Sequence, residues 1–272
     1  MAKGGIHKGI VLYMKEKLDI ALLQCDLHWE SVAKNLTQIE EYLDEISNSD
    51  IILLPEMFST GFSVESIHLA EAMDGTTVEW MKGISRKTQS ALCGSLMIKE
   101  AGHVYNRLLW VEPNGTIEYY DKRHLFSLIE EDRYFTAGKK RLIIDYKGWR
   151  ICPLICYDLR FPVFSRNDVG YDLCFYLANW PNKRIAVWDI LLKARAIENQ
   201  SYVIGLNRVG VDGYNAEYSG HSQVLDANGD LIAIAPENEI GLVECSLSKA
   251  HLQAYRDRLP FLEDQDGFDL KA

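Results

Sequence analysis

Segments with strand periodicity and segments with helix periodicity alternate along almost the whole chain. LDIALLQCDL at 18–27 is a largely apolar run typical of a strand, and the following segment has apolar residues at helical spacing. Those residues are Val32, Leu36, Ile39, Leu43 and Ile46. DIILLPE at 50–56 then indicates a buried strand. This alternation predicts an α/β fold in which helices cover a mixed sheet.

The alternation continues to the C-terminal region. Asn-Gly pairs, the strongest short hairpin signal, interrupt apolar runs at 114–115 and 228–229 and predict hairpins within 103–122 and 221–235. We find no internal repeat or Pro/Ser-rich linker, so we place no domain boundary. The remaining expected elements are helices near 76–90, 185–200 and 248–258, a short helix after 155, and strands near 91–100, 141–145, 149–155, 171–179, 201–207 and 240–247.

An acidic composition narrows the classes of function. The 272-residue chain carries 29 Lys and Arg against 39 Asp and Glu, a net charge of −10 at pH 7. Binding to nucleic acid or to an anionic membrane needs a clustered excess of basic side chains, so we expect neither. The apolar run at 10–14 is too short for a signal-peptide core or a membrane span. We expect a cytoplasmic protein that acts on a small molecule.

Six cysteines are scattered through the apolar runs, which favours free thiols in a reducing compartment over a disulfide framework. Two of them, Cys152 and Cys156, lie in CPLICYDLRFP at 152–162. Their spacing does not match a metal site or a Cys-x-x-Cys redox motif, so we expect no metal. Cys152 reads as a core residue. Cys156 falls where the apolar run stops, and is either another buried structural cysteine or a ligand-facing thiol at a strand end.

Two further charged residues also follow strands. Glu56 closes the apolar run IILLPE, and Lys122 follows the strand that ends in YYD. A base, a cation and a thiol such as that of Cys156 are the groups that covalent acyl transfer by a cysteine nucleophile requires. Each of them alone is equally consistent with an ordinary solvated side chain or a core thiol.

The blocks LLPEMFSTGF, YDKRHLF and ICYDLRFP, in this order, resemble the Glu, Lys and Cys blocks of the nitrilase superfamily of carbon–nitrogen hydrolases. RYFTAG, ANWPNKR, WDILLKARAIENQ, GLNRVG and YSGHSQVLDANG agree, so the resemblance covers about 18–247. It implies a four-layer α-β-β-α sandwich with mixed sheets, and a homodimer. It also makes residues 1–13 an N-terminal extension and 14–272 a single hydrolase domain.

The resemblance implies a mechanism without metal or organic cofactor. Cys156, activated by Glu56, would attack an amide carbon, and the oxyanion would be held by Lys122 and the backbone N–H of Tyr157. Glu131 aligns with an additional family glutamate that would orient the substrate or Lys122, although an acidic loop in water is the simpler reading of its surroundings. The histidines, His124 and His221 among them, have no role in this scheme.

ANWP and KRHLF look most like the omega-amidase branch, which hydrolyses the terminal amide of 2-oxo acids such as 2-oxoglutaramate or 2-oxosuccinamate. We expect the pocket to include Asn179, Trp180 and Arg184, with Arg184 pairing with the substrate carboxylate. For Arg160 we expect an ion pair that anchors the turn after the strand. The alternatives are the same fold acting on a nitrile, an N-carbamoyl compound or deaminated glutathione, a non-catalytic binding protein, and a redox sensor with a Cys152–Cys156 disulfide.

Overall fold

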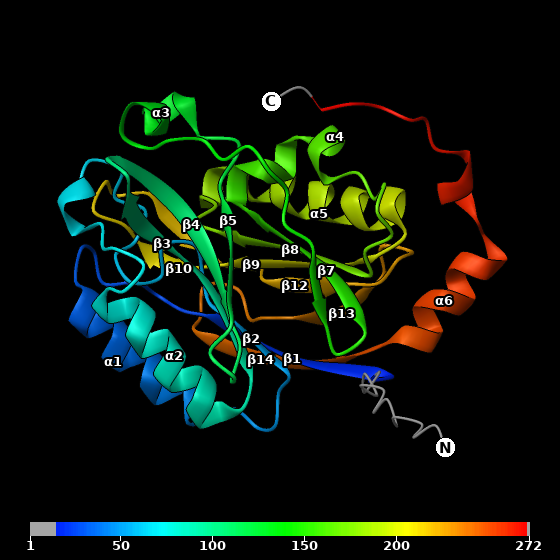
Figure 1. Ribbon diagram of the computed structural model, residues 1–272, viewed down its shortest axis with the longest axis horizontal. Helices are drawn as coiled ribbons and strands as arrows, with labels where there is room; N and C mark the ends of the chain where they lie inside the picture. Colours follow the sequence, from blue (N-terminus) through cyan, green and yellow to red (C-terminus); the bar gives the residue numbers. More distant parts are fainter. Residues whose placement is uncertain (1–14, 271–272) are drawn as a thin grey trace, which may run out of the picture.

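Two six-stranded sheets stack face to face in the computed structural model, which describes residues 15–270 (Figure 1). The expected extension at 1–13 lies outside the described residues. The first sheet has the order β14 (Gly241–Ser248), β1 (Lys17–Gln24), β2 (Ile51–Leu53), β3 (Ala91–Glu100), β4 (His103–Val111), β5 (Ile117–Asp121). The second has the order β13 (Leu231–Ile234), β12 (Gln223–Leu225), β9 (Tyr202–Asn207), β8 (Leu173–Ala178), β7 (Trp149–Ile155), β6 (Ile144–Tyr146). Both sheets mix parallel and antiparallel pairs.

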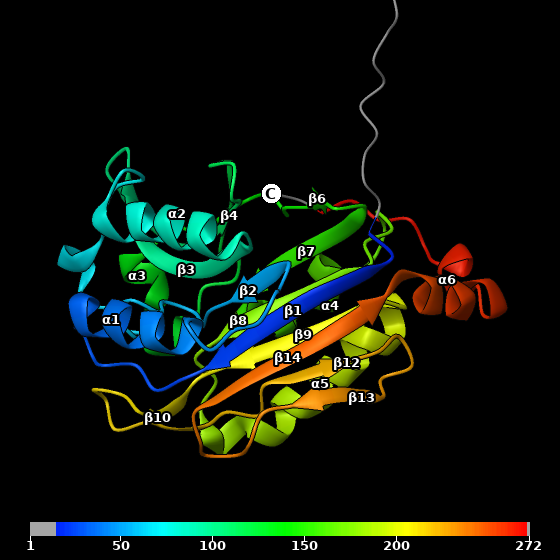
Figure 2. The ribbon, with the colours of Figure 1, turned by 90° about the horizontal axis from the view of Figure 1, so that it is seen from below.

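Helices cover the outer face of each sheet, so the expected α-β-β-α sandwich is confirmed (Figures 1 and 2). α1 (Val32–Leu43) and α2 (Thr76–Thr88) lie on the first sheet, and α4 (Pro162–Ser165) and α5 (Ile185–Asn199) on the second. α6 (Lys249–Arg258) extends from one end. The short helix α3 (Glu131–Tyr134) belongs to the connection between the two sheets.

The pleat of β1 shows how one strand serves two apolar cores. Leu18, Ile20 and Leu22 face the second sheet, whereas Ala21 and Leu23 face α1 and α2. Alternate side chains of a strand point to opposite faces, so a strand buried on both sides is apolar throughout. This double burial explains why 18–23 carries only one polar residue, Asp19.

Two expected boundaries differ from the structure, and one small sheet was not expected. α1 ends at Leu43 because the next turn tightens: Glu45 N–H donates to Tyr42 O and Ile46 N–H to Leu43 O, while Ile46 still packs on the core. β6 begins at Ile144, three residues later than expected. A two-stranded sheet of β10 (Val209–Val211) and β11 (Glu217–Ser219) was not expected, because strands of three residues are too short to show a period.

Candidate active site

Cys156 lies at the sharp turn that follows β7. The β7–β8 ladder ends at Ile155, and Cys156 opens a 3₁₀ helix, Cys156–Arg160. Its φ of 41° is left-handed, a strained conformation for a residue with a Cβ, and strain of this kind gathers at functional sites. The residue is only 9% exposed, and it lines a cavity of about 480 Å³.

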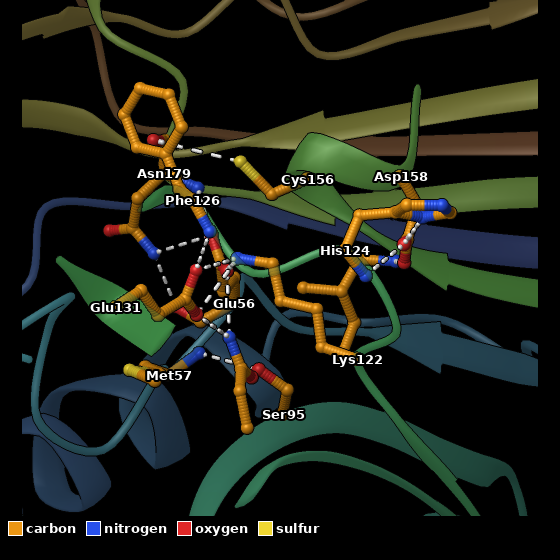
Figure 3. Close-up of polar contacts among 12 residues, drawn as sticks. Glu56, Met57, Ser95, Lys122, His124, Phe126, Glu131, Cys156, Asp158 and Asn179 are labelled. Atoms are coloured by element: carbon orange, nitrogen blue, oxygen red, sulfur yellow. Dashed lines mark hydrogen bonds and ion pairs between the residues drawn. The ribbon is translucent and has the colours of Figure 1, made fainter. Parts of the chain in front are cut away.

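Glu56 is completely buried and has hydrogen-bond donors on both carboxylate oxygens (Figure 3). Oε1 accepts from Asn106 Nδ2 at 2.8 Å and from Lys122 Nζ at 2.9 Å. Oε2 accepts from the backbone N–H of Asn179 at 2.9 Å. A buried carboxylate requires donors of this kind, and these three fix the plane of the group.

The turn after β2 that presents Glu56 is itself held in place. Met57 has a left-handed φ of 46°, and its N–H donates to Ser95 Oγ at 2.8 Å. The Asn179 side chain donates to the backbone carbonyl of Glu56 at 2.7 Å. Backbone and side chain of Glu56 are therefore both tied to neighbouring strands.

Lys122 follows β5, and its ammonium lies between two carboxylates (Figure 3). Nζ is 2.9 Å from Glu56 Oε1 and 3.0 Å from each oxygen of Glu131. Burial alone lowers the pKa of Lys122, but the negative charges of Glu131 and Glu56 outweigh it and raise the pKa above its ordinary value. The ammonium is charged throughout the working pH range.

Glu131 points inward, unlike its acidic neighbours. Glu130 and Asp132 are exposed, whereas Glu131 is completely buried and accepts from the Phe126 N–H at 2.6 Å. Burial raises the pKa of its carboxyl, and the Lys122 charge opposes that shift. The reading of Glu131 as part of a solvated acidic loop is wrong for this residue.

The Cys156 thiol holds its proton at rest. Burial raises its pKa well above the ordinary value, the negative charge of Glu56 adds to the effect, and Lys122 opposes it. Sγ lies 3.9 Å from the backbone carbonyl of Asn179. Because the thiol is protonated, attack on a substrate requires a base, and Glu56 is beside it.

The expected pocket residues line the same cavity, with distinct contacts. Tyr157 packs against Phe126, with ring centroids 4.9 Å apart. Trp180 is buried, and its Nε1 donates to the Arg184 carbonyl at 2.9 Å. The Arg184 guanidinium lies 5.2 Å from the centre of the Phe126 ring. Asn179 also lines the cavity, although its amide nitrogen is engaged by Glu56.

Other residues differ from the sequence analysis. The ion pair expected for Arg160 is not found within 15–270, and its guanidinium lies 5.0 Å from the Trp180 ring instead. Asn106 was missed as a partner of Glu56; the available signal was a polar Asn-Arg pair in the apolar strand HVYNRLLWV. His124 and His221 pair with Asp158 and Asp189.

The described part of the chain offers no second kind of site in three respects. Residues 15–270 contain no cluster of three or more His, Cys, Asp or Glu side chains able to hold a metal ion. No helix in this range is long and apolar enough to cross a membrane. All six cysteines are free, Cys152 and Cys156 included.

Comparison with known proteins agrees with this geometry. The carbon-nitrogen hydrolase family model matches residues 19–257. Omega-amidase YafV of Escherichia coli (strain K12) is 44% identical over 93% of this chain and 98% of its own. 2-Oxoglutaramate amidase of Bacillus subtilis is 31% identical over 91% of this chain and 97% of its own. The crystal structure of XC1258 from Xanthomonas campestris, a CN-hydrolase superfamily protein with an arsenic adduct in the active site, superposes with a TM-score of 0.92 at 42% identity, covering 94% of this chain and 100% of that one. The chain therefore belongs to the carbon–nitrogen hydrolase family and is an amidase of the nitrilase superfamily.

Proposed function

We propose that this protein is an omega-amidase that hydrolyses the terminal amide of a small 2-oxo acid, 2-oxoglutaramate or 2-oxosuccinamate, to the dicarboxylic acid and ammonia. The observation that carries the proposal is the buried Glu56–Lys122–Glu131 cluster beside Cys156, in a cavity whose wall includes Arg184. The relatives named omega-amidase YafV and 2-oxoglutaramate amidase support the substrate class.

In the acylation half of the reaction, Glu56 takes the thiol proton and Cys156 Sγ bonds to the amide carbon. Within the cluster this proton transfer moves a negative charge from carboxylate to sulfur without creating one, so it avoids the cost of generating an isolated buried ion. The Lys122 ammonium and the Tyr157 N–H stabilise the oxyanion. Glu56 then gives its proton to the departing nitrogen, the C–N bond breaks, ammonia leaves and a thioester remains.

In the deacylation half, Glu56 takes a proton from water, and the hydroxide attacks the thioester carbon. The new oxyanion meets the same two donors. When it collapses, the C–S bond breaks, the carboxylic acid leaves, and the Cys156 sulfur recovers a proton from Glu56. Glu131 holds Lys122 at its place throughout, because both of its oxygens contact Nζ.

We infer that Cys156 is the nucleophile, and expect Cys156→Ala to abolish ammonia release while Cys245→Ala, at the half-buried cysteine, leaves it intact. Burial raises the pKa of the Cys156 thiol, so the thiolate fraction grows as pH rises and falls as pH drops. The rate of iodoacetamide labelling at Cys156, measured by mass spectrometry, should still be climbing at pH 9. Normal turnover in Cys156→Ala would contradict the assignment.

Lys122→Met should lose both turnover and stability. The alternative reading of Lys122 as an ordinary solvated side chain is wrong, because its side chain is fully buried. Removing it leaves Glu56 and Glu131 without their shared cation, and breaking a buried pair of this kind costs about 3–5 kcal/mol. Urea unfolding monitored by circular dichroism measures the loss. The exposed Lys87→Met, which removes a surface ion pair screened by solvent, should leave the urea midpoint nearly unchanged. Equal effects of the two changes would contradict the buried-cluster assignment.

The substrate is tested by ammonia release from a panel of amides, ureides and nitriles. We expect 2-oxoglutaramate or 2-oxosuccinamate to be hydrolysed far better than neutral aliphatic amides. Preference of the unmodified protein for neutral amides, ureides or nitriles would overturn the omega-amidase proposal and leave the amidase assignment in place.

Arg184→Ala should narrow that preference. Losing a charged partner for a desolvated carboxylate commonly costs about 2–5 kcal/mol, or about thirtyfold to several-thousandfold in kcat/KM. Only carboxylate-bearing substrates should suffer. Arg258→Ala is the matched control, since that guanidinium also lies over an aromatic ring, Tyr255, but on α6. Equal losses for charged and neutral substrates in Arg184→Ala would show that Arg184 supports the fold instead.

We further propose that the protein is a cytoplasmic homodimer. Apolar side chains on the outer face of α4 and α5 support the dimer: Val163 is 54%, Ile190 68% and Ile197 47% exposed. Size-exclusion chromatography with light scattering should give about twice the 31.1 kDa chain mass, and Ile190→Glu should lower that mass. A monomeric unmodified protein at micromolar concentration would contradict the proposal.

A further inference from the structure

The carboxylate of Asp158 receives donors from two segments that come from different sheets. On the nucleophile side, Oδ2 accepts from the N–H of Ile155, the residue before Cys156, at 3.0 Å. On the lysine side, Tyr120 Oη donates to Oδ2 at 2.8 Å, and the backbone N–H of His124 donates to Oδ1 at 3.1 Å.

Further hydrogen bonds tie the segment around Lys122 to Asp158 and Tyr120. His124 Nδ1 lies 2.7 Å from Asp158 Oδ1, and the N–H of Arg123 donates to Tyr120 Oη at 3.0 Å. The His124 ring stacks on Phe161 with centroids 3.8 Å apart and planes 5° apart. Asp158 itself is completely buried. Asp158 therefore contacts Tyr120 and His124, which lie on either side of Lys122 in the sequence. It also contacts the backbone of Ile155, immediately before Cys156.

An aspartate at this point in a 3₁₀ helix commonly caps the helix by accepting a backbone N–H, and the Ile155 contact alone fits that role. Capping does not explain the donors from Tyr120 and His124, which belong to β5 and the loop after it. The additional donors are what distinguish a link between segments from a local cap.

We propose that Asp158 is a positioning residue that sets the placement of the Cys156 sulfur relative to the Lys122 ammonium, and that the stacked His124 ring secures it. The inference rests on the proposed roles of Cys156 and Lys122. Cys156 has a left-handed φ, so its turn depends on outside contacts to hold it, and Asp158 supplies one of them at Ile155. Lys122 must meet the oxyanion that forms on the carbon attacked by that sulfur. A carboxylate that is hydrogen-bonded to both segments keeps the Cys156 sulfur and the Lys122 ammonium in a fixed position relative to each other.

The test uses Asp158→Asn and Tyr120→Phe in the full-length enzyme. Asparagine has nearly the shape of aspartate, but its NH2 group replaces one of the acceptor oxygens. An NH2 group cannot accept the hydrogen bonds that this oxygen receives. We expect kcat for the amide substrate to fall about 100-fold, as for a displacement near 1 Å, with KM changing much less. Tyr120→Phe removes a single donor and leaves the charge of Asp158 in place, so we expect a smaller fall of up to about tenfold.

The rate of iodoacetamide labelling at Cys156 separates positioning from general loosening. Alkylation forms no oxyanion, so Lys122 affects its rate only through the pKa of the Cys156 thiol. The labelling rate should therefore fall much less than kcat in both variants. Asp172→Asn is the matched control: Asp172 is also buried and accepts from the Arg150 N–H at 2.9 Å, but at the opposite end of β7 and β8. It should lower the melting temperature and leave kcat per folded molecule unchanged.

Three results would overturn the inference: unchanged kcat in Tyr120→Phe and Asp158→Asn, equal losses of kcat and labelling rate, or an equal kcat loss in Asp172→Asn. If Asp158→Asn does not fold, Tyr120→Phe decides between the outcomes by the same two rates. Turnover that survives Cys156→Ala would instead contradict the proposed function, so the two failures are distinguishable.

Discussion

The site depends on one buried ammonium that is shared by two carboxylates. Without Lys122, Glu56 and Glu131 would bring two buried negative charges together with no cation between them. Without the two acids, the ammonium would be an unpaired buried cation. The donors from Asn106, Asn179 and Phe126 complete the coordination of the acids. In the proposed mechanism these contacts keep Glu56 in place while it exchanges a proton with the Cys156 sulfur.

Much of the fold followed from patterns in the sequence, and its layering followed only from the family resemblance. Periodicity indicates β1 and α1 because each is long enough to repeat its pattern, and the Asn-Gly pairs indicate the two hairpins. The same periodicity cannot say whether the strands form one sheet or two, since a strand such as β1 that is buried on both faces is apolar in either case. The short strands β10 and β11 gave no pattern at all.

For the candidate site, the sequence indicated residues whose chemistry contrasts with their surroundings. Glu56, Lys122 and Cys156 each interrupt or end an apolar run. Glu131 could be selected from three adjacent acids only by the family alignment, because local composition does not reveal which side chain turns inward. Asn106 and Asp158 contact partners distant in sequence. The polar Asn-Arg pair in an apolar strand was a local signal for Asn106, but it did not identify Glu56 as its partner. Arg160 was assigned an ion pair because an indole face cannot be foreseen as its partner.

The two sheets divide the site between them. Glu56, Asn106 and Lys122 follow or belong to strands of the first sheet, and Cys156 and Asn179 follow strands of the second. On the proposed assignments, neither half of the sandwich contains the nucleophile together with its base and cation. The proposed activity then requires both sheets, and we expect no functional fragment from a cut at the connection between them. Any change that shifts one sheet over the other will register in turnover before the secondary structure is lost.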